Sequence, residues 1–439
     1  MKSVNSILFS PKSCYTLIFY RVIFGALTLF SSLRFLSKGW IEELFLEPTF
    51  HFKYFGFQWV QVASPMVIYI LFGLMVISSL FVILGLFYRI AIVLFFLLFT
   101  YFELIDLTNY LNHYYFVSLM AFILIFLPAN TNYSLDAKLG FTKRRKLVPA
   151  WTIGIIIFQL SIVYFYAGLA KLNYDWLFEA NPLRIWLAPH TNLPVIGSLM
   201  DETITAYLFS WGGAIFDLSV PFLLLNKKTR LFGYSLVIIF HSLTSLLFPI
   251  GVFPLVMIIS TLVFFSEDFH QKILVFLFGE TKIEERHYVS KPSKFKWLLI
   301  AFIGFQLIFP FRYLLYNNDL FYTEQGYRFS WRVMLVEKAG YANFKIHPFQ
   351  DERSIEINNL DYLTAQQEKM MSIQPDFILQ YAYYLRDIYE EKYGTKVAVK
   401  ADVFISVNGK PSQRFVKKDL DLSTLKNDLK PITWLEEYK

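Results

Sequence analysis

Nine long apolar stretches, separated by short polar segments, constrain this chain more than any other feature of its sequence. A helix needs about 17–25 residues to cross a bilayer. The apolar stretches lie near residues 14–33, 64–87, 90–107, 113–128, 151–171, 205–225, 231–249, 251–266 and 297–315, and the fourth and eighth are short. Charged residues are only 17% of the chain and hydrophobic residues 56%, whereas soluble domains average about 25% charged residues. The sequence therefore predicts an α-helical polytopic membrane protein with about nine transmembrane helices.

The distribution of Lys and Arg predicts how the chain crosses the membrane. Basic clusters follow the second, fourth, sixth and eighth stretches, as in residues 138–146 and 267–296, while the segments 34–63 and 172–204 are richer in aromatic residues. Because positive charge is retained on the cytoplasmic side, we expect a cytoplasmic N-terminus and a C-terminal part outside. The Phe-, Ile-, Lys- and Tyr-rich composition favours a bacterial inner membrane. The net charge of +7 follows from these loops and does not indicate a nucleic-acid partner.

After about residue 316 the charged fraction rises and the apolar pattern shortens. The expected elements are strands at 330–337, 341–348, 352–357, 397–407 and 411–416, and one or two helices within 364–393 that break near Pro375. Lys338-Ala339-Gly340 and Asn408-Gly409 are the expected hairpin turns. We therefore expect a transmembrane domain over residues 1–315 and a small α+β domain over residues 316–439 on the outer side.

Lys171 ends an apolar helical stretch that reads IFQLSIVYFYAGLAKLNYDW, and no other charge lies between Trp151 and this lysine. An ordinary explanation is that its stem lies in hydrocarbon while the ammonium reaches the interface. Tyr164 and Gly168 share its helical face, however, and Gly168 leaves room for another backbone or a flat ligand. A partly desolvated lysine beside such a slot can act as a base.

Two other polar positions lie at membrane depth. Asn112-His113 begins the fourth apolar stretch, and His241 lies in the middle of the seventh. Each histidine alone is explained by one hydrogen bond to a neighbouring helix, worth about 1 kcal/mol or less. In the expected topology, however, Asn112, His113 and Lys171 all lie toward the outer face, which favours a shared site.

The motifs that are missing from the sequence exclude several enzyme classes. The chain contains no P-loop, GxGxxG, HExxH or GxSxG motif, and its histidines lack metal-ligand spacing. Cys14 is the only cysteine, so no internal disulfide or multi-cysteine metal site is expected. The chemistry that remains is proton abstraction by Lys171 with help from His113 and Asn112. An apolar, aromatic pocket in the membrane would suit a quinone-like or lipid substrate.

These same residues fall in motifs that resemble the vitamin K-dependent gamma-glutamyl carboxylase family and the wider bacterial set with the horizontally transferred transmembrane (HTTM) domain. The matching motifs, in order, are YRVIFGALTLFSSLRFL, NHY followed by SLMAFILIFLPAN and YSLD, YFYAGLAKLNYDW, PLRIWL, FHSLTSLLFPIGVF, GYRFSWRVMLVEKAGYANFKI and FISVNGKPSQRF. The resemblance covers nearly the whole chain, and the AGxxKLxxDW and NHxY runs are its most specific parts.

The resemblance implies an enzyme that oxygenates a reduced naphthoquinone (phylloquinol or menaquinol) to its epoxide. The strong base formed on the way carboxylates peptide glutamate, with oxygen and carbon dioxide as co-substrates and no metal or flavin. Lys171 matches the residue that deprotonates the quinol, and His113 with Asn112 would stabilise the developing anion. The other residues implied at the site are Tyr164, Gly168, His241 and Met334 for the quinol, and Tyr327, Trp331, Val333 and Arg184 for the glutamate substrate. Such a site must be dry, because water would quench the base.

Some positions depart from the animal enzyme of this family. Ala170 replaces a second lysine, Thr244 replaces an asparagine, and the chain ends soon after Trp434, so we expect no propeptide-binding extension. Two alternatives to the carboxylase stay open: a quinol epoxidase that acts on another C–H bond, and a non-catalytic membrane module that binds quinone or lipid. A transporter is less favoured, because the stretches do not form two matching halves.

Overall fold

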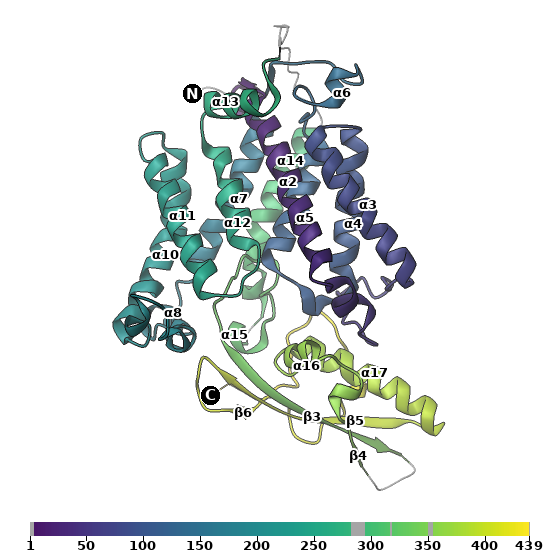
Figure 1. Ribbon diagram of the computed structural model, residues 1–439. Coiled ribbons are helices and arrows are strands. Elements are labelled where there is room, and N and C mark those ends of the chain that lie inside the picture. The colour runs from purple at the N-terminus through teal and green to yellow at the C-terminus, as the bar shows by residue number, and fades with distance from the viewer. Residues whose placement is uncertain (1–3, 282–294, 317, 350–353, 439) are drawn as a thin grey trace.

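The computed structural model describes residues 4–281, 295–316, 318–349 and 354–438. A bundle of long helices occupies one end of the molecule, and a small domain with a sheet occupies the other (Figure 1). The long helices are α2 (Tyr15–Ser37), α3 (Pro65–Leu84), α4 (Tyr88–Ile105), α5 (Asn112–Phe126), α7 (Ala150–Ala170), α10 (Thr203–Leu225), α11 (Arg230–Leu247), α12 (Phe253–Thr261) and α14 (Phe295–Ile308), which continues as the 3-10 helix η6 (Phe309–Leu315). Each predicted apolar stretch thus contains a helix, which confirms the helical membrane fold.

The two short stretches are the ones that differ from simple spans. Within the described residues, seven helices are long and apolar enough to cross a membrane, and α5 has only 15 residues. Helix α12 passes through the short η5 (Leu262–Phe264) and is bent by 116° against α13 (Glu267–Phe278). Helix α13 contains the charged start of the predicted basic segment, and it lies with the N-terminus at the end of the bundle away from the sheet (Figure 1). Residues 282–294 of that segment lie outside the described residues.

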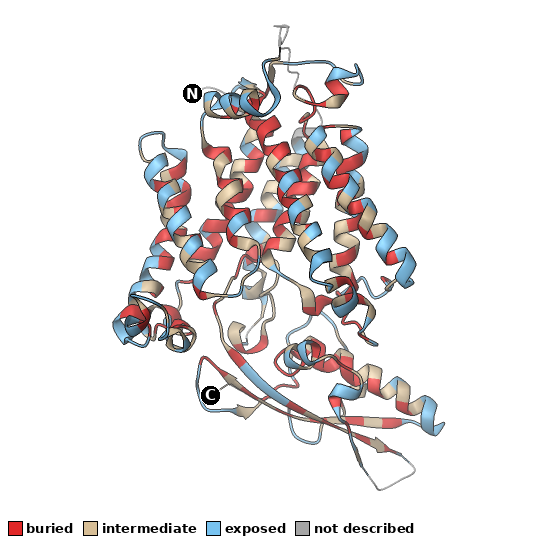
Figure 2. Ribbon diagram, in the orientation of Figure 1, coloured by how far each residue is buried: buried red, intermediate tan, exposed pale blue. Residues whose placement is uncertain are grey.

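Helix α2 runs through the bundle and contacts α3, α7, α12 and α13. Much of its length is buried, whereas exposed residues line α3 at the edge of the bundle (Figure 2). The exposed residues of α3 are large and apolar, including Met66, Ile70 and Ile77. Apolar residues exposed over the whole length of a helix indicate contact with lipid. These outward faces therefore support the membrane assignment.

The end of the bundle near the N-terminus is tied together by charged side chains. Arg21 of α2 is fully buried and donates hydrogen bonds to the carbonyl oxygens of Ala129, Ile83 and Tyr133. Asp136, in the short helix α6 (Leu135–Lys138), accepts from the backbone N–H of Phe87 and Tyr88 and from Asn130. Strands β1 (Pro11–Ser13) and β2 (Leu147–Pro149) pair nearby. These contacts fix the loops between spans, where buried polar groups need partners.

The outer domain contains a four-stranded antiparallel sheet in the order β4-β3-β5-β6. Its strands are β3 (Lys338–Pro348), β4 (Ile355–Glu356), β5 (Val397–Val407) and β6 (Gln413–Arg414). Helices α16 (Ala365–Met371) and α17 (Pro375–Tyr393) cover one face, where the Tyr381 and Phe344 rings lie 4.9 Å apart. The alternation of β5, the helix break at Pro375 and the turn at Asn408-Gly409 were predicted correctly.

The prediction of a strand at 330–337 was wrong. Strand β3 pairs along its whole length with β5, from Lys338 opposite Val407 to Pro348 opposite Val397, and residues 330–337 form turns and irregular structure. Phe329, Trp331 and Met334 have positive φ angles of 59°, 60° and 50°, which a strand does not permit. Trp331 and Leu335 are buried against the membrane helices instead, while Val336 packs on the outer-domain core, so the alternation does not mark a sheet.

The outer domain is attached to the membrane bundle through the two aromatic-rich outer segments, 34–63 and 172–204. Phe52 packs on Phe377 of α17 at 4.7 Å between ring centres, and the backbone of Lys53 exchanges two hydrogen bonds with the Gln380 side chain. At the far side of the junction, the Asn408 amide donates to Asp175 at 2.7 Å. Several outer-loop aromatic residues therefore bind the outer domain rather than form a lipid-facing belt.

Candidate active site

Lys171 lies at the C-terminal end of α7 and is buried, with only 6% of its surface exposed. Its Nζ lies 2.6 Å from Oδ2 of Asp217, and 3.4 Å from the carbonyl oxygen of Ala167. The ammonium also lies 5.3 Å from the ring centre of Trp176, within range of a cation–π interaction. Lys171 therefore does not extend to the interface, and the first explanation given for it is wrong.

Asp217 is a site residue that the sequence analysis missed. It is the only charged residue in α10, and it is as buried as Lys171. Gly213, one turn earlier, leaves space beside the lysine, because a Cβ there would lie 3.8 Å from Lys171 Cε. A lone acid within an apolar span is a functional signal in its own right. Applying that rule to α10 as well as to α7 would have identified Asp217.

Gly168 leaves room for the backbone of a neighbouring helix, which is the first of the two roles predicted for it. A Cβ at this position would lie 2.7 Å from the backbone nitrogen of Leu218, so the absence of a side chain lets α7 approach the backbone of α10. Gly168 does not line the cavity next to Lys171. Its contribution is the close helix contact that brings Lys171 and Asp217 together, and α10 occupies the space beside it.

A small apolar cavity of about 90 Å³, called here the lysine cavity, adjoins this pair; among the residues that line it are Tyr164, Lys171, Asp217, His241, Val333 and Met334. The Tyr164 hydroxyl lies 3.2 Å from both His241 Nε2 and Thr261 Oγ1. His241 is buried, and its Nδ1 has no hydrogen-bond partner among the described residues. The cavity thus brings together three of the four residues predicted to bind the quinol.

Asn112 and His113 lie apart from this cavity. Asn112 donates to the carbonyl oxygen of Arg332 at 2.8 Å. His113 lines a second cavity of about 70 Å³. The Phe253 ring lies between the two histidines, 5.7 Å from His113 and 5.6 Å from His241. In this structure Asn112 and His113 therefore do not share the cavity of Lys171 and His241, because an aromatic side chain lies between the two histidines.

The four residues assigned to the glutamate substrate also lie in different places, and only one of them lines the lysine cavity. Val333 reaches the lysine cavity, but Trp331 is buried and stacked on Tyr115 at 4.9 Å. Tyr327 is half-buried in the segment before the outer domain, and burial raises the pKa of its phenol. Arg184 is exposed on the short helix α9 (Leu183–Leu187) and does not line the cavity.

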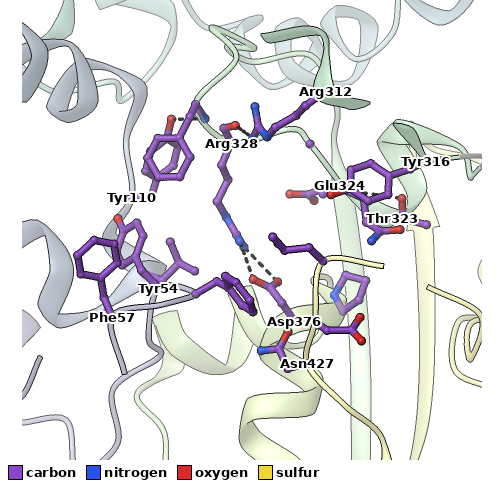
Figure 3. A pocket seen from close by; sticks show the side chains of 18 of the residues that line it. Tyr54, Phe57, Tyr110, Arg312, Tyr316, Thr323, Glu324, Arg328, Asp376 and Asn427 are labelled. Carbon is purple, nitrogen blue, oxygen red and sulfur yellow. Dashed lines mark hydrogen bonds and ion pairs between the residues drawn. The ribbon is translucent and has the colours of Figure 1, made fainter. Parts of the chain in front are cut away.

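A much larger cavity of about 840 Å³, called here the interdomain chamber, lies between the membrane bundle and the outer domain. Figure 3 shows Tyr54, Phe57 and Tyr110 on one side of it and Thr323, Glu324 and Tyr316 on the other. The chamber and the lysine cavity share no lining residue. The irregular segment 326–334 separates them, since Gly326, Arg328 and Phe329 face the chamber while Val333 and Met334 face the lysine cavity.

Two family models match the chain. The model described as HTTM domain matches residues 9–269, and the model described as vitamin K-dependent gamma-carboxylase, lumenal domain, matches residues 291–439. No solved structure matches the chain. Among the described residues, no three His, Cys, Asp or Glu side chains are grouped as a metal site requires. The membrane bundle followed by an outer domain agrees with the order of the two models, and the chain belongs to the vitamin K-dependent gamma-carboxylase family of membrane proteins.

Proposed function

We propose that this protein is a vitamin K-dependent carboxylase that couples epoxidation of a reduced naphthoquinone to carboxylation of protein glutamate. The observation that carries the proposal is the buried Lys171–Asp217 pair, at 2.6 Å, in the wall of an apolar cavity. A charged pair in such surroundings is costly to maintain for stability alone. An ionisable group inside the membrane is therefore first interpreted as functional, and this applies to Lys171 and Asp217.

The cavity provides the groups that a quinol requires. His241 Nδ1 is a buried polar atom without a partner, and it offers a hydrogen bond to a quinol oxygen. Phe240, Phe253 and Met334 supply apolar surface for the ring. Ligand sites usually have volumes of about 300–1,000 Å³, so the side chains around the lysine cavity must move apart when a naphthoquinol binds.

Lys171 can become a base by passing its proton to Asp217. Transfer from Nζ to Oδ2 along their hydrogen bond converts the ion pair into a neutral amine and a neutral acid, and the amine can then accept a phenolic proton. With oxygen, reduced vitamin K supplies the strong base that removes a γ-hydrogen from glutamate, after which carbon dioxide adds to that carbon. Burial of Lys171 and Asp217 excludes the water that would quench this base.

Asn112 and His113 act on the site through other residues in this proposal. The bond from Asn112 to Arg332 holds the segment that carries Val333 and Met334. His113 packs on Phe253, which lines the lysine cavity. Both are therefore positioning residues. The outer domain would face the bacterial periplasm and receive the glutamate-containing protein.

The test uses the full chain in nanodiscs with reduced vitamin K, oxygen, labelled bicarbonate and a glutamate peptide. The wild-type protein should form epoxide and labelled peptide, and Lys171→Ala and Asp217→Asn should lose both. Lys38→Ala is the matched control, because Lys38 also caps a membrane helix but is exposed. Epoxide without labelled peptide would support a quinol epoxidase, and quinone binding without epoxide would support a non-catalytic module.

A further inference from the structure

The interdomain chamber has walls of two kinds. Its membrane side is largely apolar and is formed by α4, α5 and η6, where Phe96, Phe122 and Phe309 line it. Its outer side contains charged residues of η6 and of the outer domain. With a volume of about 840 Å³ it is large enough for a ligand. A ligand that fills both halves must itself be amphipathic.

The cations on the outer side outnumber the carboxylates that remain free to balance them. Asp376 makes a two-pronged ion pair with Arg328 at 2.6 and 3.3 Å, and Glu324 pairs with Lys338 at 2.9 Å. Figure 3 shows Arg328 extending to Asp376. The third carboxylate, Asp428, accepts a backbone N–H at 3.0 Å. Two of the three outer carboxylates in the wall are therefore paired with cations, and within the described part of the chain only Asp428 keeps a charge without an ion pair.

Three cations of the chamber wall have no carboxylate partner among the described residues. Arg312 donates only to the carbonyl oxygens of Phe309 and Arg328. Lys426 and Lys430 lie at the exposed rim, and no ion pair includes either side chain. One carboxylate of the wall, Glu103, likewise has no partner, but it belongs to the membrane helix α4. Unpaired positive charge thus lies at the interfacial end of the chamber, and the one acidic residue that the structure describes on the membrane side is Glu103.

We propose that the interdomain chamber binds an anionic phospholipid. The unpaired cations Arg312, Lys426 and Lys430 attract its acidic head group, and the acyl chains lie against Phe96 and Phe122. Basic pockets between transmembrane helices on the cytoplasmic side bind acidic head groups by the same attraction of opposite charges. The proposal goes beyond the carboxylase function and does not depend on it. Because both domains line the chamber, the lipid joins the membrane bundle to the outer domain and stabilises their arrangement.

The test titrates the delipidated full chain with a short-chain phosphatidylglycerol and records the thermal unfolding midpoint. Phosphatidylglycerol should raise the midpoint, whereas short-chain phosphatidylcholine should raise it less, and free glycerol phosphate should leave it unchanged. Each cation removed should weaken lipid binding about fivefold. The triple variant Arg312→Gln/Lys426→Gln/Lys430→Gln should therefore bind roughly 100-fold more weakly. Lys418→Gln is the control, because Lys418 is an exposed lysine of the same C-terminal segment and does not line the chamber.

Two further variants separate the parts of the proposal. Ser118→Trp fills the membrane side of the chamber without removing a cation, and it should abolish the lipid response. Glu103→Gln removes the unpartnered carboxylate, and it should leave lipid binding unchanged or strengthen it. The proposal is overturned if the triple variant responds like the wild type, if glycerol phosphate acts as well as lipid, or if Glu103→Gln weakens binding. It is also overturned if a reduced naphthoquinone or a glutamate peptide stabilises the wild type and phosphatidylglycerol does not.

Discussion

The Lys171–Asp217 pair makes a prediction about stability that can be separated from catalysis. Exposed ion pairs contribute about 0–1 kcal/mol, but these side chains are only 7% and 6% exposed, so the rules for buried pairs apply. Removing one partner of a buried pair costs about 3–5 kcal/mol, because the remaining charge has no partner. We therefore expect Lys171→Met and Asp217→Leu each to lower the free energy of unfolding by about this amount.

The double variant Lys171→Met/Asp217→Leu should be far more stable than the sum of the two single changes predicts. Replacing a buried pair by apolar side chains of similar volume is often neutral or stabilising, so the interaction energy between the two sites should be several kcal/mol. The measurement is unfolding in mixed micelles, and Lys38→Met is the control, with an expected change within about 0.5 kcal/mol.

The double variant should recover stability but not catalytic activity. The double variant regains the fold but has neither the amine nor its proton acceptor, so epoxide formation should stay absent. Strictly additive single changes would show that Lys171 and Asp217 do not interact in the membrane, and the proton transfer proposed for them would then have no basis.

Three further predictions follow from other contacts. Tyr164→Phe removes the hydroxyl that is hydrogen-bonded to His241. Loss of a hydrogen bond of about 1 kcal/mol corresponds to about a fivefold fall in kcat for epoxide formation. A change in KM alone would show that this hydrogen bond does not support the chemical step. Gly168→Val should destabilise the protein by about 1–3 kcal/mol, since its Cβ would lie 2.7 Å from the backbone of α10; an unchanged unfolding midpoint would show that the two helices do not approach this closely. The hydrogen bond from Arg414 lowers the pKa of Asp402 in the folded state, so this carboxylate stabilises the fold above its unfolded pKa and ceases to do so as pH falls through the lower folded pKa. Asp402→Asn should reduce the acid-induced loss of unfolding free energy by no more than about 1 kcal/mol, because the pair is partly exposed. An unaltered dependence of unfolding free energy on pH would show that Arg414 contributes nothing.

Hydropathy predicted the membrane bundle because each helix that contacts lipid needs a nearly unbroken apolar sequence. The same reasoning could not place the bend between α12 and α13, which depends on packing around α2. The strand predicted at 330–337 failed for a related reason. Alternating burial is a local signal, but Trp331 is buried against Tyr115 while Met334 lines the lysine cavity, and the two do not lie on the faces of a sheet.

The candidate site shows the same limit. Lys171 was identified because its own helix contains no other charge, and His241 because it interrupts an apolar span. Asp217 comes from α10, 46 residues further along the chain, and one-span-at-a-time reasoning does not pair residues on different helices. Separation of His113 from the lysine cavity depends on the Phe253 ring, and the position of a ring between two helices has no sequence signature.

The contact between Asn408 and Asp175 has a practical consequence for shortened versions of this protein. Asp175 precedes Trp176, whose ring lies against the Lys171 ammonium, so deleting the outer domain would remove a restraint one residue away from that ring. A membrane bundle expressed by itself would therefore differ around the lysine even if every helix formed. Loss of activity in such a fragment would not show that the outer domain takes part in the chemistry.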